Sequence, residues 1–409
     1  MKRASASVMA TAVAMSWLIV AGGFPVAACK DDGPPVEVKG LADSLNKFTW
    51  DVYPRLRSKP GNHCFSPVAI ANSLTLVAAG ARGRTADQLF TALHLNDRRG
   101  EQTHEAMRQL SEWLKVYSGQ AGCELHLAVA LWTRGERNLQ PGYVELGRKF
   151  YGAEFHRLAH DDAPEKLRQR INQWAERQTK GKITQLLVDN DLDAGIFLLL
   201  TSANYFQANW KFPFDQRLTQ QQDFVTDSGK TVRVAMMHGM FWLPYYADEQ
   251  VQLVLLPYSC TGLNMAILMP RGNQTELSKL EQSLQSESLQ RWLSRAQVDR
   301  VELSLPRFQV QGSYRLEHVL AELGCKDVFT PGVADLSGIT GNRDLYVGRM
   351  WHKALTTVSE QGTEAAAATT VEFKAVPVAF RVNRPFLFLI MDIRSGLILF
   401  AGRVVNPLG

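Results

Sequence analysis

The sequence predicts an α+β fold, with helices concentrated in the first half of the chain and strands in the second. In the first half, apolar residues recur at helical spacing along two segments. They are Leu41, Leu45, Phe48 and Val52 in one segment, and Leu167, Ile171 and Trp174 in the other. In the second half, apolar residues recur at every second position, as on half-buried strands. They are Val251, Leu253 and Leu255, and then Val301, Leu303 and Leu305. This order of helices and strands is typical of α+β packing.

The C-terminal part continues the strand pattern. Residues Phe386–Ile390 form an uninterrupted apolar run, which suits a strand buried on both faces. The turn sequence Arg394-Ser395-Gly396 then leads into Leu397–Phe400, so we expect a hairpin. With 45% hydrophobic residues in a chain of 409, there is ample apolar material for one large domain or two. No internal linker rich in Gly, Pro or Ser and no repeat divides the chain.

The charge distribution argues against a nucleic-acid partner. The formal net charge is +5, which is modest for this length, and nucleic-acid binders concentrate their basic residues. Here the densest basic groups, Arg82-Gly83-Arg84 and Arg98-Arg99, are short. We interpret them as solvated surface.

The N-terminus has the pattern of an export signal. Lys2 and Arg3 precede an apolar stretch over residues 10–24, and small residues then lead to Cys29. The stretch is too short and too rich in Ala and Gly for a transmembrane helix. Its end resembles a bacterial lipoprotein box, in which Cys29 becomes the lipidated first residue. The alternative is ordinary signal cleavage after Ala28.

We therefore expect a signal peptide over residues 1–28, a tether over 29–40 and a folded domain over 41–409. The predicted location is exported: extracellular, periplasmic or anchored to the outer membrane as a lipoprotein. Membrane contact is expected only through a lipid on Cys29, since a single acyl chain holds weakly and several hold firmly.

The remaining four cysteines, Cys64, Cys123, Cys260 and Cys325, allow three full pairings. An exported domain permits disulfides, but Cys64 and Cys325 sit in contexts that suit buried thiols. No Cys/His spacing indicates a metal site.

Motifs for catalysis are missing. Ser66 and His352 are a conceivable hydrolase pair, but no G-x-S-x-G elbow is present. His104-Glu105 lacks the second His of a zinc protease motif, and there is no P-loop or dinucleotide fingerprint. We predict no catalytic residue, no metal and no cofactor.

The most informative segment is Glu360–Thr370, which reads EQGTEAAAATT. In an extended strand, alternate side chains point to opposite faces. One face would carry small, then β-branched, then aromatic side chains: Thr363, Ala365, Ala367, Thr369, Val371 and Phe373. The other face would carry Glu364, Ala366, Ala368, Thr370, Glu372 and Lys374, and thus all three charged residues. Such a strand could bury its first face over a core and leave its second face in water, and Gly362 supplies a flexible pivot. An Ala-rich helical turn or a loose linker is the alternative.

This segment resembles the hinge of the reactive loop in inhibitory serpins, and the resemblance extends over nearly the whole chain after its leader. The motifs that carry it are CFSPVAI from Cys64, INQW from Ile171, TKGKI from Thr179, NYFQANW from Asn204, LPRF from Leu305, ADLSGI from Ala334, NRPFLF from Asn383 and GRVVNP from Gly402. Each motif alone is weak, but their order and spacing together are specific.

The resemblance implies the serpin fold, with three β-sheets, about eight or nine helices and an exposed reactive-centre loop over residues 360–382. It implies a monomeric suicide-substrate inhibitor of serine proteases, with some family members acting on cysteine proteases. The protease cleaves the loop and forms an acyl-enzyme, and the freed arm inserts into the main sheet. The hinge would comprise Glu360, Gly362, Thr363, Glu364, Ala365, Ala366, Ala367, Ala368 and Thr369.

The reactive bond stays open between alternatives. Counting from Glu360 by the family's usual spacing gives Val376–Pro377, where Pro is a poor leaving side. Counting back from the NRPF motif gives Lys374–Ala375, which suits a trypsin-like protease. Ala375–Val376 lies between them and suits an elastase-like protease. The loop is two residues shorter than usual, so slow insertion could leave a protein that is only cleaved.

The resemblance also implies a sheet-opening region at Ser66, Ser202, Trp210 and His352. The family usually has Asn at position 202 and Ser at position 69, where this chain has Ser202 and Ala69. We expect the shorter Ser202 to leave His352 without its usual partner, with an ordered water as substitute.

Two further functions compete with inhibition. One is a non-inhibitory serpin that acts as a carrier, a chaperone or a decoy substrate. Such relatives carry bulky or charged residues or Pro in the insertion phase, which is clean here from Thr363 through Val371. The other is a lipid-tethered binding module with an inert loop.

Overall fold

The computed structural model describes residues 33–135, 138–189, 191–192, 197–271, 277–361 and 376–409. The folded unit begins at Pro34. Its helices are α1 (Val36–Leu56), α2 (Pro67–Gly80), α3 (Gly83–Ala92), α4 (Glu101–Ser118), α5 (Pro141–Tyr151), α6 (Pro164–Gln178), α7 (Leu277–Ser283), α8 (Ser286–Arg295), α9 (Glu317–Glu322) and α10 (Ser337–Thr340). Its strands are β1 (His63–Phe65), β2 (Cys123–Arg134), β3 (Glu154–Leu158), β4 (Leu198–Ala208), β5 (Gln220–Val225), β6 (Thr231–Ala247), β7 (Val251–Pro257), β8 (Leu263–Pro270), β9 (Gln297–Pro306), β10 (Phe308–Arg315), β11 (Arg349–Val358), β12 (Val378–Arg381), β13 (Phe386–Asp392) and β14 (Leu397–Val404).

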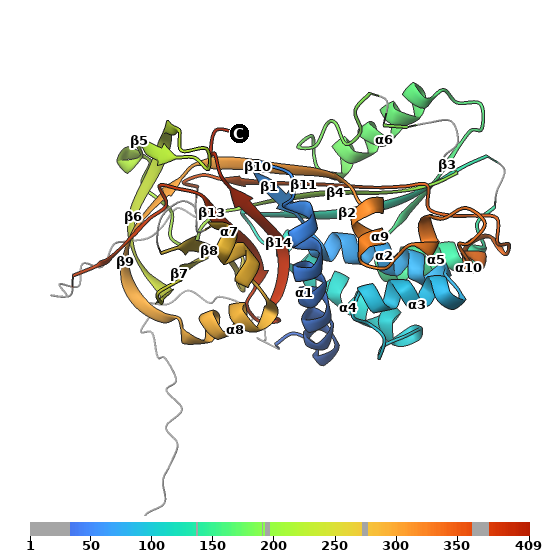
Figure 1. The fold of residues 1–409 in the computed structure, drawn as a ribbon, viewed down its shortest axis with the longest axis horizontal. Helices are drawn as coiled ribbons and strands as arrows, with labels where there is room; N and C mark the ends of the chain where they lie inside the picture. The colour runs from blue at the N-terminus through green and yellow to red at the C-terminus, as the bar shows by residue number, and fades with distance from the viewer. Residues whose placement is uncertain (1–32, 136–137, 190, 193–196, 272–276, 362–375) are drawn as a thin grey trace, which may run out of the picture. The chain divides into compact units, whose positions relative to one another are not determined.

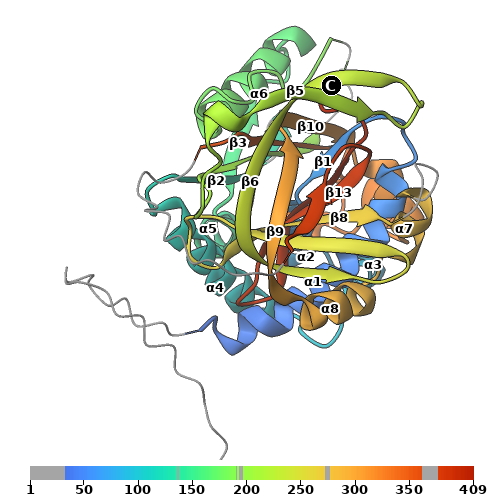
Figure 2. The same cartoon turned by 90° about the vertical axis from the view of Figure 1, so that its left-hand side faces the viewer.

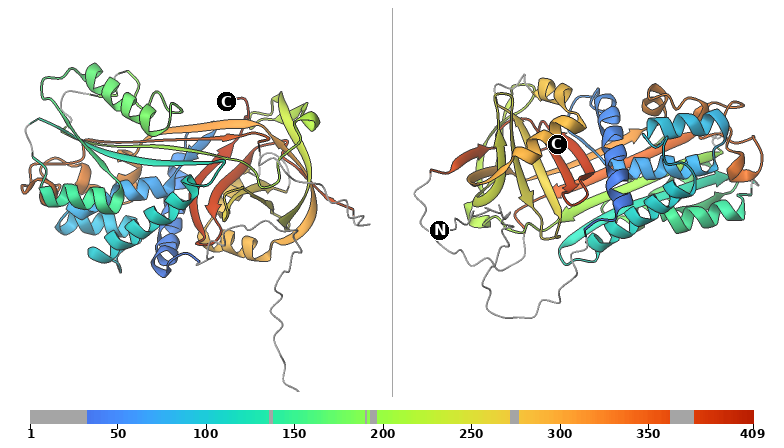
Figure 3. Two further views of the ribbon diagram at one scale, coloured as in Figure 1. Left: turned by 180° about the vertical axis from the view of Figure 1, so that it is seen from behind. Right: turned by 90° about the horizontal axis from the view of Figure 1, so that it is seen from below.

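A five-stranded sheet, in the order β10-β11-β4-β2-β3, lies between two layers of helices. In Figure 1, α6 lies above this sheet, and α2, α4 and α5 lie below it; the left view of Figure 3 shows the same layers from behind. β4 alternates between the two apolar cores. Leu198 and Leu200 pack into the main core below, whereas Leu199 and Ala203 pack with Trp174 of α6. Because it is covered on both faces, β4 is buried from Leu198 through Phe206.

The other strands form a nine-stranded sheet that contains the path β1-β14-β13-β8-β7-β6-β9-β12, with β5 paired to β6. The long strand β6 connects its two parts, because Met236–Tyr245 pair with β9 and Tyr245–Ala247 pair with β7. Figure 2 shows β6 and β9 running across the molecule. The three sheets expected from the family resemblance are thus joined into two in the described residues.

The α+β class predicted from the sequence is confirmed. The apolar faces at 41–52 and 167–174 belong to α1 and α6, and the alternating segments belong to β7 and β9. The run Phe386–Ile390 lies in β13, which forms an antiparallel hairpin with β14. One boundary is corrected: α1 begins at Val36, so residues 36–40 of the predicted tether are helical, with Val38 buried in the core.

Among the described residues, no helix has the length and apolar character needed to cross a membrane. In the same part of the chain, no cluster of His, Cys, Asp and Glu side chains has the composition of a metal site.

One disulfide joins the two sheets. Cys123, at the start of β2, is bonded to Cys260 in the turn between β7 and β8, with a Cα–Cα distance of 6.0 Å. Cys64 and Cys325 are buried free thiols, as their contexts suggest. Burial raises the pKa of both thiols well above the usual value, so neither is a reactive thiolate.

We expect the Cys260→Ser variant to be less stable than the wild type by about 2–4 kcal/mol, because the disulfide closes a long loop in the unfolded chain. The measurement is the thermal midpoint with and without a reducing agent. Reduction should lower the midpoint of the wild type by several degrees and leave that of Cys260→Ser unchanged. Equal sensitivity of both proteins to the reductant would contradict the prediction.

Candidate functional site

The candidate site is the junction between β4 and β11 and the segment that follows β11. The two strands are direct neighbours and run parallel, from Arg349 opposite Leu199 to Thr356 opposite Phe206. β11 ends at Val358, shortly before Glu360. If the chain turned back after Glu360 and entered the sheet between them, it would run antiparallel to both strands. Parallel pairing is slightly less stable per residue than antiparallel pairing, so such an exchange would improve both ladders.

Glu360 is held in a charged anchor where the chain leaves β11. Its side chain is only 3% exposed. The Arg307 guanidinium donates to Glu360 Oε2 from Nε at 2.6 Å, and Thr219 donates its hydroxyl to Oε1 at 2.5 Å. Burial alone would raise the pKa of Glu360, but its hydrogen bonds and the positive charge of Arg307 together lower that pKa below its ordinary value. The first residue of the predicted hinge is therefore an ionised, fully partnered carboxylate.

Trp210, which follows β4, fixes the backbone on both sides of Glu360. Its indole N–H donates to the Ser359 carbonyl at 2.7 Å, and its backbone N–H donates to the Gln361 carbonyl at 2.9 Å. Between these, the Glu360 carbonyl accepts the backbone N–H of Phe214 at 3.2 Å. Three consecutive carbonyls are thus bound to the segment 210–214, and the chain enters the loop from a defined position.

A second cluster lies in the middle of the same strand pair, around His352. Its ring is buried on β11, directly opposite Ser202 of β4. Ser202 Oγ lies 2.8 Å from Nδ1, and the backbone N–H of Ser66 donates to Nε2 at 3.0 Å. The expectation that Ser202 is too short to reach His352 is therefore wrong, because the register places the two residues face to face. No bridging water is needed.

The amide that the family usually has at position 202 is found two residues further along β4. Asn204 lies on the same face as Ser202, and its Nδ2 is 3.4 Å from His352 Nδ1. It also donates to the Lys353 carbonyl at 3.2 Å. The polar cluster thus holds both a hydroxyl and an amide next to one imidazole.

These contacts define the protonation state of His352. Nε2 accepts a hydrogen bond from a backbone N–H, so it carries no proton, and the neutral ring must be protonated at Nδ1. Nδ1–H can then donate to Ser202 Oγ. A second proton on Nε2 would face the Ser66 N–H, and burial lowers the pKa of His352 to about 3. The imidazole is a neutral structural group at physiological pH.

Ser66 has no catalytic geometry in this structure. It is the N-cap of α2, where its Oγ accepts the Ala69 N–H at 3.4 Å and donates to the Leu399 carbonyl at 2.8 Å. Its contact with His352 uses the backbone N–H and not the hydroxyl. A nucleophile must be hydrogen-bonded through its hydroxyl to its base, so the pair Ser66 and His352 does not form such a unit.

The predicted loop itself lies mostly outside the described residues. This holds for the candidate bond residues Lys374 and Ala375 and for the hinge residues Gly362, Thr363, Glu364, Ala365, Ala366, Ala367, Ala368 and Thr369. The structure describes both flanks. Glu360 is buried in its anchor, whereas Val376 is 90% exposed, two residues before β12 begins at Val378.

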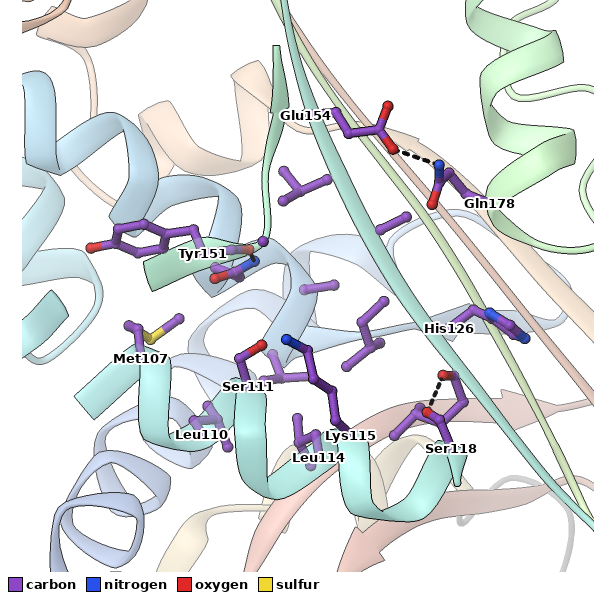
Figure 4. A pocket seen from close by; sticks show the side chains of 18 residues that line it. Met107, Leu110, Ser111, Leu114, Lys115, Ser118, His126, Tyr151, Glu154 and Gln178 are labelled. Atoms are coloured by element: carbon purple, nitrogen blue, oxygen red, sulfur yellow. Dashed lines mark hydrogen bonds between the residues drawn. The ribbon is translucent and has the colours of Figure 1, made fainter. Parts of the chain in front are cut away.

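A cavity of about 280 Å³ lies beside the first part of β2 and is lined by residues of α4 and by Gln178 at the end of α6. Figure 4 shows Leu110, Ser111 and Lys115 of α4 on one side of it, and the Gln178–Glu154 hydrogen bond, at 2.6 Å, on another. β3 pairs with β2 only from Ala130 onward. On the edge that faces away from β4, the first part of β2 therefore has side chains and open space next to it and no paired strand.

Sequence reasoning missed the partners of Glu360. Arg307 belongs to the LPRF motif, but nothing in that motif indicates a contact 53 residues along the chain. Thr219 and Phe214 follow β4 in a segment without a motif. The only available signal was a charge at the start of a hinge that is otherwise made mostly of small residues.

Comparison with known proteins agrees with this geometry. The model of the family described as Serpin (serine protease inhibitor) matches residues 43–407. A leukocyte elastase inhibitor from Homo sapiens is 35% identical over 380 residues, covering 90% of this chain and 99% of that protein. An uncharacterized serpin-like protein from Thermococcus kodakarensis is 34% identical over 376 residues, covering 90% and 86%. Serpin B9 from Homo sapiens is 36% identical over 363 residues, covering 86% and 95%.

The described residues define an α+β protein built around a five-stranded sheet, in which β11 ends shortly before the predicted reactive loop. The chain belongs to the serpin family.

We expect acid to destabilise the native protein through His352. The pKa is about 3 in the folded chain and about 6.5 in the unfolded chain. The stabilising contribution is fully present above pH 6.5 and is lost as pH falls toward 3, with a slope of at most about 1.4 kcal/mol per pH unit. Thermal midpoints of wild type and His352→Gln, measured from pH 7 to pH 4, test this. The thermal midpoint of the variant should be lower at pH 7 and should fall less steeply as the pH decreases. Parallel curves of midpoint against pH for the two proteins would contradict the role assigned to His352.

We expect Arg307→Met to weaken the anchor of the loop. It leaves the buried Glu360 carboxylate without its cation, at a cost of about 1–3 kcal/mol. The first thermal transition of the intact protein is the measurement. In a Glu360→Gln background the same substitution should cost much less, because the charge it leaves unpaired is already gone. Additive effects in the double variant would show that the ion pair does not hold the loop.

Proposed function

We propose that this protein inhibits serine endopeptidases as a suicide substrate, acting as an inhibitor and not as an enzyme. The observation that carries the proposal is the direct parallel pairing of β4 with β11, with β11 leading into the loop. The target protease attacks a bond in the loop and forms an acyl-enzyme with its own serine. The released arm then enters between β4 and β11 and displaces the bound protease, whose distorted site cannot complete hydrolysis.

The sequence of the arm suits this insertion. The phase from Thr363 through Val371 carries small and β-branched side chains, which fit over a packed core without overpacking. A dozen inserted residues would add two hydrogen-bonded ladders, and each hydrogen bond contributes about 0.5–1.5 kcal/mol net. Burial of Val371 and Phe373 adds about 2–3 kcal/mol each. A gain on the order of 10 kcal/mol makes the trap effectively irreversible.

The arrangement of the sheet is compatible with opening. The parts of β4 and β11 that must separate are held at two places, the Glu360 anchor and the His352 cluster. The cavity beside β2 leaves one side of the moving strands without a close-packed strand neighbour. Displacement there would break fewer backbone hydrogen bonds than at a fully paired strand.

The target is proposed to be a trypsin-like protease that cleaves Lys374–Ala375, or an elastase-like protease that cleaves Ala375–Val376. The high exposure of Val376 supports access to this end of the loop. One relative is named leukocyte elastase inhibitor, which is compatible with the second choice. A cysteine protease remains an additional target class.

We propose an exported, monomeric protein, anchored through a lipid on Cys29 or released after ordinary cleavage at that point. The Cys123–Cys260 disulfide supports an oxidising compartment. The competing function, a non-inhibitory serpin that is merely cleaved, is less compatible with the clean insertion phase of the arm.

The deciding experiment mixes the domain from residue 34 onward with trypsin and, separately, with elastase. We expect an SDS-stable adduct and a released C-terminal peptide whose first residue identifies the bond. The cleaved protein should melt well above the intact one. Cleavage without an adduct, and without a rise in the melting temperature, would favour the non-inhibitory alternative.

We expect Thr363→Arg to convert inhibition into plain cleavage, since a long charged side chain would face the core on insertion. Glu364→Arg is the matched control: it places the same side chain on the opposite, solvent-facing phase and should still inhibit. The measurement is the molar ratio of inhibitor needed per protease. The insertion argument is falsified if both variants form adducts as efficiently as the wild type.

A further inference from the structure

A polar groove lies on the outer face of the strands β5, β6, β9 and β12, which belong to the nine-stranded sheet. Figure 2 shows β5, β6 and β9 in this sheet. The groove has a volume of about 520 Å³, and Met236 is the only apolar residue among the nine described residues that line it. Small-molecule sites have volumes of about 300–1,000 Å³ but mostly apolar walls. An occupant of this groove is therefore expected to be small and rich in polar groups.

The polar side chains of the groove form a row across three strands. His238 of β6 is opposite Ser304 of β9, and Ser304 is in turn opposite Arg381 of β12. Directly opposed residues share a face of the sheet, and Glu302, two residues before Ser304 on β9, returns to that face. The intervening Leu303 is buried in the core. The register of the sheet therefore brings these four polar residues together on its outer face.

The groove holds one free charge of each sign. Arg233 and Asp223 are already paired with each other, at 3.0 Å between Nη1 and Oδ1. Arg381 and Glu302 are both exposed, and neither has an ion pair with the other or with any further residue that the structure describes. Because they lie on neighbouring strands and two residues out of register, their Cα atoms are about 8 Å apart. A cation and an anion are thus held near each other without neutralising each other.

His238 adds a polar atom without a partner to the same row. Its Nδ1 lies 3.0 Å from Ser304 Oγ, whereas its Nε2 is buried and has no hydrogen-bond partner among the described residues. Burial lowers the pKa of His238, the charge of Glu302 opposes this shift and that of Arg381 adds to it, so both charged side chains lie close to the ring. The neutral ring presents Nε2 as an N–H donor or as a lone-pair acceptor, depending on the tautomer. In either tautomer, a polar partner at Nε2 would be stabilising.

We propose that this groove binds a small zwitterion of dipeptide size, with its carboxylate on Arg381 and its ammonium on Glu302. A guanidinium binds a carboxylate through two parallel hydrogen bonds, and an ammonium donates to a carboxylate. A simple anion such as phosphate would be repelled by Glu302, and a simple cation would be repelled by Arg381, so a ligand that carries both charges fits the groove best. The inference goes beyond the proposed function and does not depend on it.

The separation of the two charges selects the length of the ligand. An extended chain spans about 3.3–3.6 Å per residue, so a dipeptide places its terminal charges about 7 Å apart. This length matches the separation of about 8 Å between the Cα atoms of Arg381 and Glu302. A free α-amino acid, whose two charged groups are attached to one carbon, would reach both side chains only if they moved together. The peptide bond of a dipeptide also supplies one donor and one acceptor, so it satisfies His238 Nε2 in either tautomer.

The test is titration calorimetry of the wild-type protein with the dipeptide glycylleucine. We expect a dissociation constant of about 0.1–1 mM, since two charged contacts on an open groove give a modest affinity. Acetyl-glycylleucine, which lacks the ammonium, and glycylleucine amide, which lacks the carboxylate, should each bind at least about tenfold more weakly. Equal binding of all three compounds, or no binding of glycylleucine at about 10 mM, would overturn the proposal.

Two single variants test the assigned contacts. Arg381→Gln should weaken the binding of glycylleucine about tenfold, and it should bind glycylleucine amide as the wild type does, because the contact with the carboxylate is already lost. Glu302→Gln should likewise weaken glycylleucine and bind acetyl-glycylleucine as the wild type does. Both side chains are exposed, so the melting temperatures of the two variants should stay unchanged.

Arg177→Gln is the matched control for Arg381→Gln. Arg177 is exposed on α6, which covers the five-stranded sheet, so its substitution removes the same charge without reaching the groove. The affinity for glycylleucine should stay unchanged. Affinities within about twofold of the wild type for both Arg381→Gln and Glu302→Gln would overturn the site. That result would leave the proposed inhibition untouched, and absence of an adduct with a protease would equally leave the site untouched.

Discussion

The parallel pairing of β4 with β11 is the constraint on which the rest of the candidate site depends. These two neighbouring strands of one sheet run parallel, and β11 ends shortly before the predicted reactive loop. β4 is buried on both faces, so a segment that replaced β11 beside it would have to form a regular β-strand with one apolar face. The sequence between Glu360 and Phe373 has that alternation. The proposed insertion would therefore replace one parallel ladder by two antiparallel ladders.

Two different interactions hold this strand pair closed. At the end of β11, Glu360 depends on charge: its carboxylate is ionised and bound by Arg307. In the middle, His352 depends on the absence of charge, because its Nε2 must accept a backbone hydrogen bond from Ser66. The Glu360 and His352 interactions respond to different perturbations. Substitution of a cation releases the first, and acid releases the second. The strand pair is thus restrained at two independent points, as the proposed mechanism requires.

Much of the fold could be predicted from the sequence, because the periodicity of α1, α6, β7 and β9 and the apolar run in β13 report burial directly. Pairings between distant segments could not. The register that sets Ser202 against His352 depends on strands about 150 residues apart, so a short side chain was wrongly judged unable to reach. For the same reason the anchor between Arg307 and Glu360 was missed. The sequence allowed three full pairings of the four cysteines, whereas the structure has the Cys123–Cys260 disulfide and leaves Cys64 and Cys325 as buried thiols.

The Cys123–Cys260 disulfide has a mechanical consequence. Cys123 is opposite Ala208 at the end of β4, and the neighbouring Asn209 is hydrogen-bonded both to Gly122 and to Ser259. The covalent link keeps the start of β2 within 6.0 Å of the turn at Cys260, measured between Cα atoms. Because the start of β2 is fixed to the β7–β8 turn, β2 cannot move away from that turn as a rigid unit. Any widening of the sheet on the β2 side must be a rotation about this fixed corner, with the largest displacement at the opposite end of the strands.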